Sequence, residues 1–110
     1  MGSLFYGSSH DPIEIPDRVL AHVKVVIATK LRRGESFTMS WRHPSGETAG
    51  RSTLWIQPSI PLRFVFGGVE PEVLDPAVLQ TYANSANSAS GLTVDVEEHA
   101  SPFAAPVEAS

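Results

Sequence analysis

Residues 17–41 read DRVLAHVKVVIATKLRRGESFTMSW, and the spacing of apolar side chains changes from helical to alternating at Gly34. On a helical wheel of residues 18–33, the large aliphatic side chains fall within about 120° of arc, the width of a stripe that faces a core. These side chains are Val19, Leu20, Val23, Val26, Ile27 and Leu31. The pattern predicts a helix that depends on burial of this stripe, because the β-branched run at 25–27 lowers its intrinsic helix propensity.

The ends and the polar side of this helix carry further predictions. Asp17 is expected to be the N-cap, with its carboxylate accepting from the free amides of the first turn. Gly34 is expected to end the helix in the left-handed conformation, with Arg32 and Arg33 at the negative end of the helix dipole. His22 falls opposite the apolar stripe and is expected to be exposed to solvent.

The residues after Gly34 alternate in polarity. Phe37, Met39 and Trp41 share one parity, and the polar side chains between them share the other. Strict alternation is typical of a strand with one buried and one exposed face, which favours antiparallel pairing. Trp41 is therefore expected to lie in the core.

The rest of the chain adds further strands and a second helix. Alternation predicts strands at residues 3–6, 13–15, 51–57, 62–66 and 92–97, the first two being candidates for a hairpin. Asp75-Pro76 predicts a helix start, because Asp is a favoured cap and proline lacks an amide that the first turn would leave unpaired. The order β-β-α-β-β-β-α-β predicts an α+β fold in which two helices pack on one face of an antiparallel sheet.

Length and composition limit the kind of protein. A chain of 110 residues is the size of one domain. We expect residues 1–97 to form that domain and residues 98–110, rich in Ala, Pro, Ser and Glu, to be a disordered acidic tail. The chain has no cysteine, and no apolar run approaches the roughly 18 residues of a membrane span. We therefore expect a cytoplasmic protein without disulfides that does not enter a membrane.

The sequence contains no catalytic, cofactor or metal motif. The glycines match neither phosphate-binding pattern, and no serine lies in a nucleophile elbow. His10, His22, His43 and His99 lack the spacing of metal ligands. We therefore expect a protein that is not an enzyme and needs no cofactor or metal.

The residues with the most functional content are basic and aromatic. The candidate binding face consists of Arg32, Arg33, Arg42, Arg51, Trp55 and Arg63. Arg51 and Trp55 have the same strand parity and so share a face. Arginine binds phosphate and an exposed tryptophan stacks on bases, which favours nucleic acid, whereas the same set is typical of a protein hot spot. The third reading is structural: Trp55 packs under a loop or helix, and the arginines pair with acidic side chains.

Six short segments of the chain resemble a known family. They are Met1–Gly7, Leu31–Phe37, Ser40–Trp41, Gly50–Ser52, Trp55–Leu62 and Ser85–Ser88. They resemble small actinobacterial proteins that are grouped as a domain of unknown function, and the similarity covers roughly residues 1–96. Many members of that family carry the genome label "ATP-dependent DNA ligase". The label implies a nucleophilic lysine in a Lys-x-Asp-Gly motif, and neither Lys24 nor Lys30 has that setting.

These observations favour a small, non-enzymatic binding domain in the cytoplasm. Its partner is expected to be a protein, with a homodimer the simplest case, bound through Trp55 or through an edge strand near Pro58–Pro61. The alternative is a nucleic-acid-binding accessory protein that uses the basic and aromatic face. Against that alternative, the pI of about 5.4 is low for a nucleic-acid-binding domain.

Overall fold

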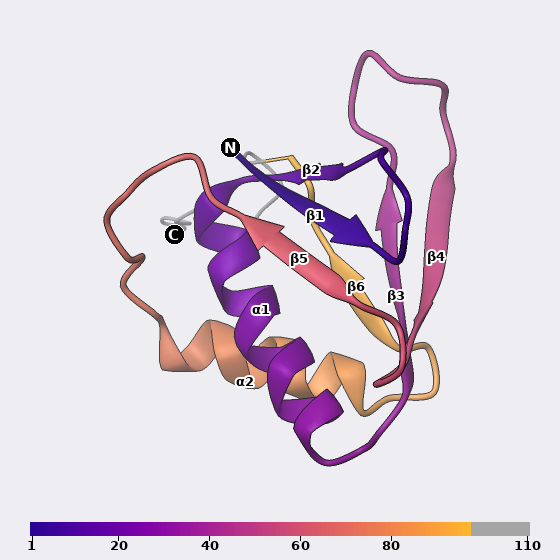
Figure 1. The fold of residues 1–110 in the computed structure, drawn as a ribbon, viewed down its shortest axis with the longest axis vertical. Coiled ribbons are helices and arrows are strands. Elements are labelled where there is room, and N and C mark those ends of the chain that lie inside the picture. The colour runs from indigo at the N-terminus through magenta and orange to yellow at the C-terminus, as the bar shows by residue number, and fades with distance from the viewer. Residues whose placement is uncertain (98–110) are drawn as a thin grey trace, which may run out of the picture.

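The computed structural model describes residues 1–97, and its elements follow the predicted order (Figure 1). They are β1 (Gly2–Tyr6), β2 (Ile13–Ile15), α1 (Asp17–Arg32), β3 (Phe37–Arg42), β4 (Arg51–Ile56), β5 (Leu62–Val65), α2 (Pro76–Ala86) and β6 (Leu92–Val94). The α+β class and the order β-β-α-β-β-β-α-β are confirmed. The predicted tail, residues 98–110, lies outside the described residues.

The strands form two three-stranded sheets, not the single antiparallel sheet that the sequence predicted. The first sheet has the order β2-β1-β5 with antiparallel pairs, so the N-terminal hairpin is confirmed. The second has the order β4-β3-β6, and β6 runs parallel to β3. Two features of the chain explain the correction. Pro58 and Pro61 separate β4 from β5 and cannot donate to a ladder, and α2 lies in the long crossover that a parallel pair requires.

The apolar stripe of α1 forms the centre of the core. Val19, Leu20, Val23, Val26 and Ile27 are buried, as predicted, and Leu31, the last residue of the stripe, is partly buried and packs against the core. Strand β1 packs against α1, and α2 packs against both α1 and β6 (Figure 1). Gly34 has a φ of 74°, the left-handed conformation expected at the end of the helix.

The N-terminus of α2 confirms one prediction and corrects another. Asp75 is the N-cap and accepts from the Ala77 N–H at 2.9 Å, with Pro76 in the first turn. His22, however, is fully buried. Its Nε2 accepts from the Asp75 N–H at 2.7 Å, and its Nδ1 lies 2.7 Å from the Arg18 carbonyl. The expectation of a solvent-exposed His22 was wrong because α2 begins against this side of α1.

Asp17 is not the N-cap of α1, which corrects a second prediction. Pro16 holds that position without a side-chain cap, and Asp17 is the first helical residue. Its carboxylate instead accepts from the N–H groups of Gly67 and Gly68, each at 3.0 Å. The hydrogen bond from Gly67 is the main cause that lowers the pKa of Asp17, partly opposed by burial. The carboxylate thus fastens the start of α1 to the chain just after β5.

Trp41 lies on the core side of β3, but it is only half-buried and packs against the core from outside. Its cross-strand neighbours are Ser52 and Val94. Ser52 is too small to cover the indole on its side. The prediction that Trp41 faces the core is therefore confirmed, but its side chain lies at the margin of the core.

Candidate binding surface

The outer face of the β4-β3-β6 sheet gathers the exposed and half-buried side chains that lie between the core residues of these strands. We call this surface the outer face and define it by Thr38, Ser40, Arg42, Arg51, Thr53, Trp55 and Thr93. The register places Thr53, Ser40 and Thr93 in one row across the three strands. Because successive strand residues point to opposite sides, the buried residues Phe37, Met39 and Ile56 fix the orientation of this whole set.

Trp55 is the large apolar side chain of the outer face, and it is 55% exposed. It lies opposite Thr38 on β3, so no bulky neighbour covers it from that strand. The Tyr6 hydroxyl donates to the Trp55 carbonyl, which joins the end of β1 to β4 through the backbone and leaves the indole in solvent. A hydrogen bond of this kind fixes the strand, and therefore the direction in which the indole points.

Arg42 and Arg51 lie directly opposite each other at the far end of the same two strands. Like charges in this position are destabilising unless a counter-charge is near. For Arg42 the counter-charge is Asp95: partial burial raises the pKa of Asp95, and the positive charge of Arg42 opposes that rise. The Arg51 side chain has no hydrogen bond or ion pair within residues 1–97. The positive charge of Arg51 is therefore unpaired among the described residues.

Strand β4 is an edge strand, with a hydrogen-bonded neighbour on one side only. The His43 N–H donates to the Gly50 carbonyl at 2.8 Å, which sets the phase of the β3–β4 ladder. Because hydrogen-bonded and non-hydrogen-bonded pairs alternate in an antiparallel ladder, Arg51, Thr53 and Trp55 direct their peptide groups away from β3. The same three residues therefore offer both their side chains on the outer face and their backbone groups at the edge.

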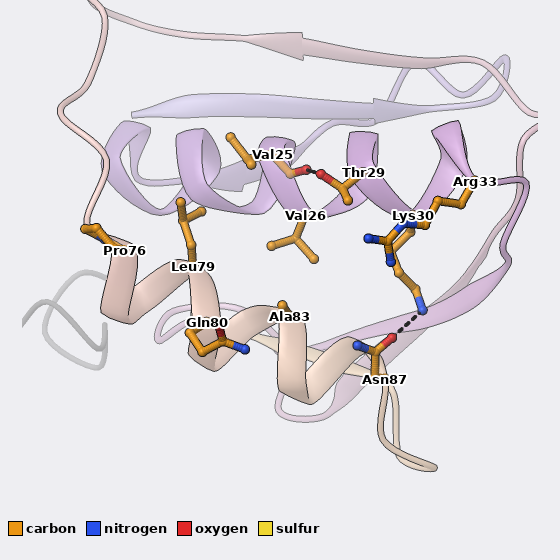
Figure 2. A pocket seen from close by; sticks show the side chains of 10 residues that line it. All are labelled: Val25, Val26, Thr29, Lys30, Arg33, Pro76, Leu79, Gln80, Ala83 and Asn87. Carbon is orange, nitrogen blue, oxygen red and sulfur yellow. Dashed lines mark hydrogen bonds between the residues drawn. The ribbon is translucent and has the colours of Figure 1, made fainter.

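Three residues of the predicted face lie elsewhere. Arg32 and Arg33 are at the C-terminal end of α1. Figure 2 shows Arg33 beside Lys30, at one end of a groove of about 370 Å³ between α1 and α2. Arg63 is in the other sheet, on β5, with its guanidinium carbon 5.5 Å from the centre of the Phe5 ring. The structure thus brings together Arg42, Arg51 and Trp55, and it separates them from Arg32, Arg33 and Arg63.

The histidine of the β3–β4 loop has a structural role. Nδ1 of His43 lies 2.9 Å from the Thr48 carbonyl, and its Nε2 lies 2.8 Å from the Ser52 hydroxyl. Both ring nitrogens are therefore used to brace the loop between the strands. Within residues 1–97, no group of three or more His, Asp and Glu side chains is arranged to hold a metal ion.

The sequence alone did not reveal which residues would share the outer face. Parity on β4 predicted that Arg51 and Trp55 share a face, but the position of Arg42 depends on the register between β3 and β4, which the composition of the loop at residues 43–50 does not fix. The proximity of Asp95 to Arg42 follows from the parallel pairing of β6, for which the sequence has no local signal.

No helix within the described part of the chain is long and apolar enough to cross a bilayer.

Comparison with known proteins gives one match. The model of a family described as a domain of unknown function, DUF7882, matches residues 1–98. No curated protein and no solved structure matches the chain. The match spans both sheets and both helices, and the chain therefore belongs to the DUF7882 family.

Proposed function

We propose that this domain is a non-enzymatic binding module whose contact surface is the outer face together with the open edge of β4. The observation that carries the proposal is the 55% exposed Trp55 on an edge strand whose peptide groups at the same residues point outward. An exposed tryptophan costs free energy in an isolated domain and is a preferred anchor in protein contacts. Backbone groups at a sheet edge add the hydrogen bonds of strand addition.

A protein partner fits this surface better than a nucleic acid. Of the two arginines on the outer face, Arg42 is already close to Asp95. The net charge of −4 for the whole chain also opposes binding to a polyanion. The rest of the face carries the hydroxyl groups of Thr38, Ser40, Thr53 and Thr93, of which those of Ser40 and Thr53 hydrogen-bond to each other at 2.8 Å. The face is thus polar but uncharged there, and a hydroxyl can make further hydrogen bonds to a peptide without requiring a charged partner.

The proposal includes the absence of catalysis. The sequence resemblance brings an actinobacterial origin and a ligase label, and the label is not part of the function that we propose. Neither lysine of the chain, Lys24 nor Lys30, lies in a Lys-x-Asp-Gly motif. Lys30 is instead paired with Glu35 at 3.1 Å, and its ammonium donates to the Asn87 side chain at 2.7 Å, a bond that Figure 2 shows. We also propose a cytoplasmic location and no bound cofactor.

Affinity capture with matched variants tests the protein-binding proposal. The immobilised wild-type domain, Trp55→Ala and Val73→Ala are exposed to a lysate of the cells that make the protein, and the retained proteins are identified by mass spectrometry. Val73 is the matched control, because it is an 86% exposed apolar side chain outside the outer face. We expect a set of proteins that wild type and Val73→Ala retain after a wash at high salt and that Trp55→Ala loses. Equal retention by Trp55→Ala would remove Trp55 from the binding surface and contradict the proposal.

Nucleic acid is a second candidate because Arg42 and Arg51 lie side by side on the face that carries Trp55. Two adjacent guanidinium groups can contact neighbouring phosphates while an exposed indole stacks on a base. A gel shift with single-stranded DNA should then weaken steeply as salt rises, because phosphate contacts release counterions. Arg51→Glu should abolish the shift and Arg63→Glu, on the other sheet, should keep it. Equal behaviour of the two variants would remove this candidate.

A further inference from the structure

We infer that β4 pairs with β4 of a second copy of the same chain, in an antiparallel register that places Thr53 on the two-fold axis. The inference rests on the proposed function, because it names the occupant of the same surface. It makes Arg51 and Trp55 a complementary pair across the dimer.

The two edges of the β4-β3-β6 sheet differ in how they are protected. At the β6 edge, the Thr93 N–H donates to the Ser85 hydroxyl of α2 at 3.2 Å, so a side chain already covers the strand. At the β4 edge, the protection within the described chain is the Tyr6 hydroxyl on the Trp55 carbonyl. Among residues 1–97, the outward peptide groups of Arg51 and Thr53 have no partner. Figure 1 shows β4 at the margin of the molecule, with β3 on its inner side.

The phase of the ladder allows this strand to pair with itself. Arg51, Thr53 and Trp55 all direct their peptide groups outward. In an antiparallel pair centred on Thr53, each Thr53 faces its own copy, and each Arg51 faces the partner's Trp55. Every residue that must hydrogen-bond across the new ladder therefore has outward groups. If the register of the two β4 strands shifted by one residue, Thr53 would face Ser52 or Leu54 of the second copy. The peptide groups of those two residues point inward and already bond to β3.

The side chains in this register are complementary. Arg51 lacks a partner within residues 1–97, and Trp55 is 55% exposed. Side chains directly opposite across a ladder lie about 5 Å apart at Cβ, which places a guanidinium against an indole face. The contact occurs twice because of the two-fold axis. The negative face of the indole would stabilise the positive charge of Arg51, which Arg42 on the neighbouring strand repels.

Tyr6 limits the length of the pairing. A carbonyl oxygen has two lone pairs, so Trp55 can accept from Tyr6 and from a second strand together. Beyond Trp55, Pro58 and the start of β5 turn the chain away. A pairing confined to residues 51–55 buries a small area, which predicts a reversible dimer that forms at high protein concentration.

Single-cysteine variants test the register directly, because the chain has no cysteine of its own. Thr53→Cys places two thiols opposite each other on the axis, where Cα atoms about 5.5 Å apart are within the range of a disulfide. Thr93→Cys is the matched control, because Thr93 is also an exposed threonine of the same face but lies on the protected edge. We expect mild oxidation to convert Thr53→Cys to a covalent dimer at least about tenfold faster than Thr93→Cys, a difference that corresponds to about 1.4 kcal/mol. Equal rates would overturn the inference.

A residue exchange tests the Arg51–Trp55 contact independently. Sedimentation equilibrium gives the dimer fraction at concentrations up to about 1 mM, the range in which a small interface is populated. Trp55→Arg should lose the dimer, because Arg51 would face an arginine of the partner. The double variant Arg51→Trp with Trp55→Arg keeps the composition and should recover the dimer. No recovery in a folded double variant would contradict the contact.

Failure of this inference and failure of the proposed function give different results. A monomer at every concentration, with slow cross-linking of Thr53→Cys, combined with Trp55-dependent capture of another protein, rejects the second copy and keeps the binding surface. A monomer whose capture profile is unchanged by Trp55→Ala rejects both.

Discussion

The N-terminal half of α1 and the outer face of β4 use their polar groups in opposite ways. Asp17 and His22 are bonded to residues 50 and 53 positions away in the sequence, so their hydrogen bonds hold distant segments together. Arg51 and Trp55 make no such side-chain contact in the described chain, and Trp55 is 55% exposed. The contrast indicates that Asp17 and His22 contribute to stability, whereas Arg51 and Trp55 have no such role within residues 1–97.

The largest effect is expected from a charge in the stripe of α1. Leu20 is 0% exposed, and Leu20→Asp would bury a carboxylate without a partner. We expect the variant to lose its cooperative thermal transition, as measured by circular dichroism. A cooperative transition close to that of wild type would show that α1 is not the centre of the core.

His22→Leu separates the role of the hydrogen bonds from that of burial. Leucine fills a similar space, but the Asp75 N–H loses its acceptor at the start of α2. A buried donor without a partner costs about 1–3 kcal/mol, which should appear in urea denaturation. An unchanged free energy of unfolding would place His22 among the residues that stability does not need.

Asp17→Asn should weaken the hydrogen bonds from Gly67 and Gly68 to residue 17 and change how the free energy of unfolding depends on pH. An amide has one oxygen where the carboxylate has two, so one glycine N–H loses its acceptor, at a cost of about 1–2 kcal/mol near neutral pH. The hydrogen bond from Gly67 lowers the pKa of Asp17 in the folded state. The unfolded chain therefore takes up the proton first as the pH falls. The stabilisation by Asp17 is present above the ordinary carboxyl pKa and is lost as the pH falls through the lowered value.

Urea denaturation of wild type and Asp17→Asn between about pH 6 and pH 2 measures this loss. The difference between the two proteins should shrink as the pH falls. A difference that stays constant over that range would show that the charge of Asp17 does not strengthen its hydrogen bonds with Gly67 and Gly68.

Tyr82→Phe should have a small effect of the opposite sign. The Tyr82 side chain is buried, and its hydroxyl has no hydrogen-bond partner among residues 1–97. Burial, with a further contribution from the charge of Asp95, raises its pKa, so the ring stays neutral. Removal of an unsatisfied hydroxyl should leave stability unchanged or raise it by about 1 kcal/mol. A clear loss of stability in thermal unfolding would mean that the hydroxyl has a partner in solution.

The smallest change in stability is expected on the outer face itself. Trp55→Ala and Arg51→Ala should each alter the free energy of unfolding of the monomer by less than about 0.5 kcal/mol, as is usual for exposed positions. Dilute samples in urea denaturation measure this value. A loss as large as that of His22→Leu would remove the distinction between the two regions.

Local patterns predicted the elements well, and long-range contacts account for what they missed. The stripe of α1, the left-handed Gly34 and the Asp75-Pro76 helix start depend on neighbours within a few residues, and all are confirmed. Asp17 and His22 were misread because their partners lie far along the chain, and local rules assign each to its nearest role. The split into two sheets depends on which strands β5 and β6 select as neighbours, and alternation alone does not specify that choice.

The candidate surface divides in the same way. The shared face of Arg51 and Trp55 follows from strand parity and could be predicted. The position of Arg42 opposite Arg51 follows from register, and the separation of Arg63 follows from the second sheet. The sequence analysis placed Arg42, Arg51 and Arg63 on one face because the sequence does not show that β5 belongs to a different sheet from β3 and β4.

Acrylamide quenching of Trp55 fluorescence tests the central claim most directly. The variant Trp41→Phe removes the other tryptophan, since the chain has two. In dilute solution Trp55 should emit as a solvent-exposed indole and be quenched efficiently. Quenching should fall when a higher protein concentration forms the dimer or when a captured partner covers the face. Weak quenching of Trp55 in the dilute, folded monomer would show that the indole is buried, and it would contradict the assignment of this face to binding.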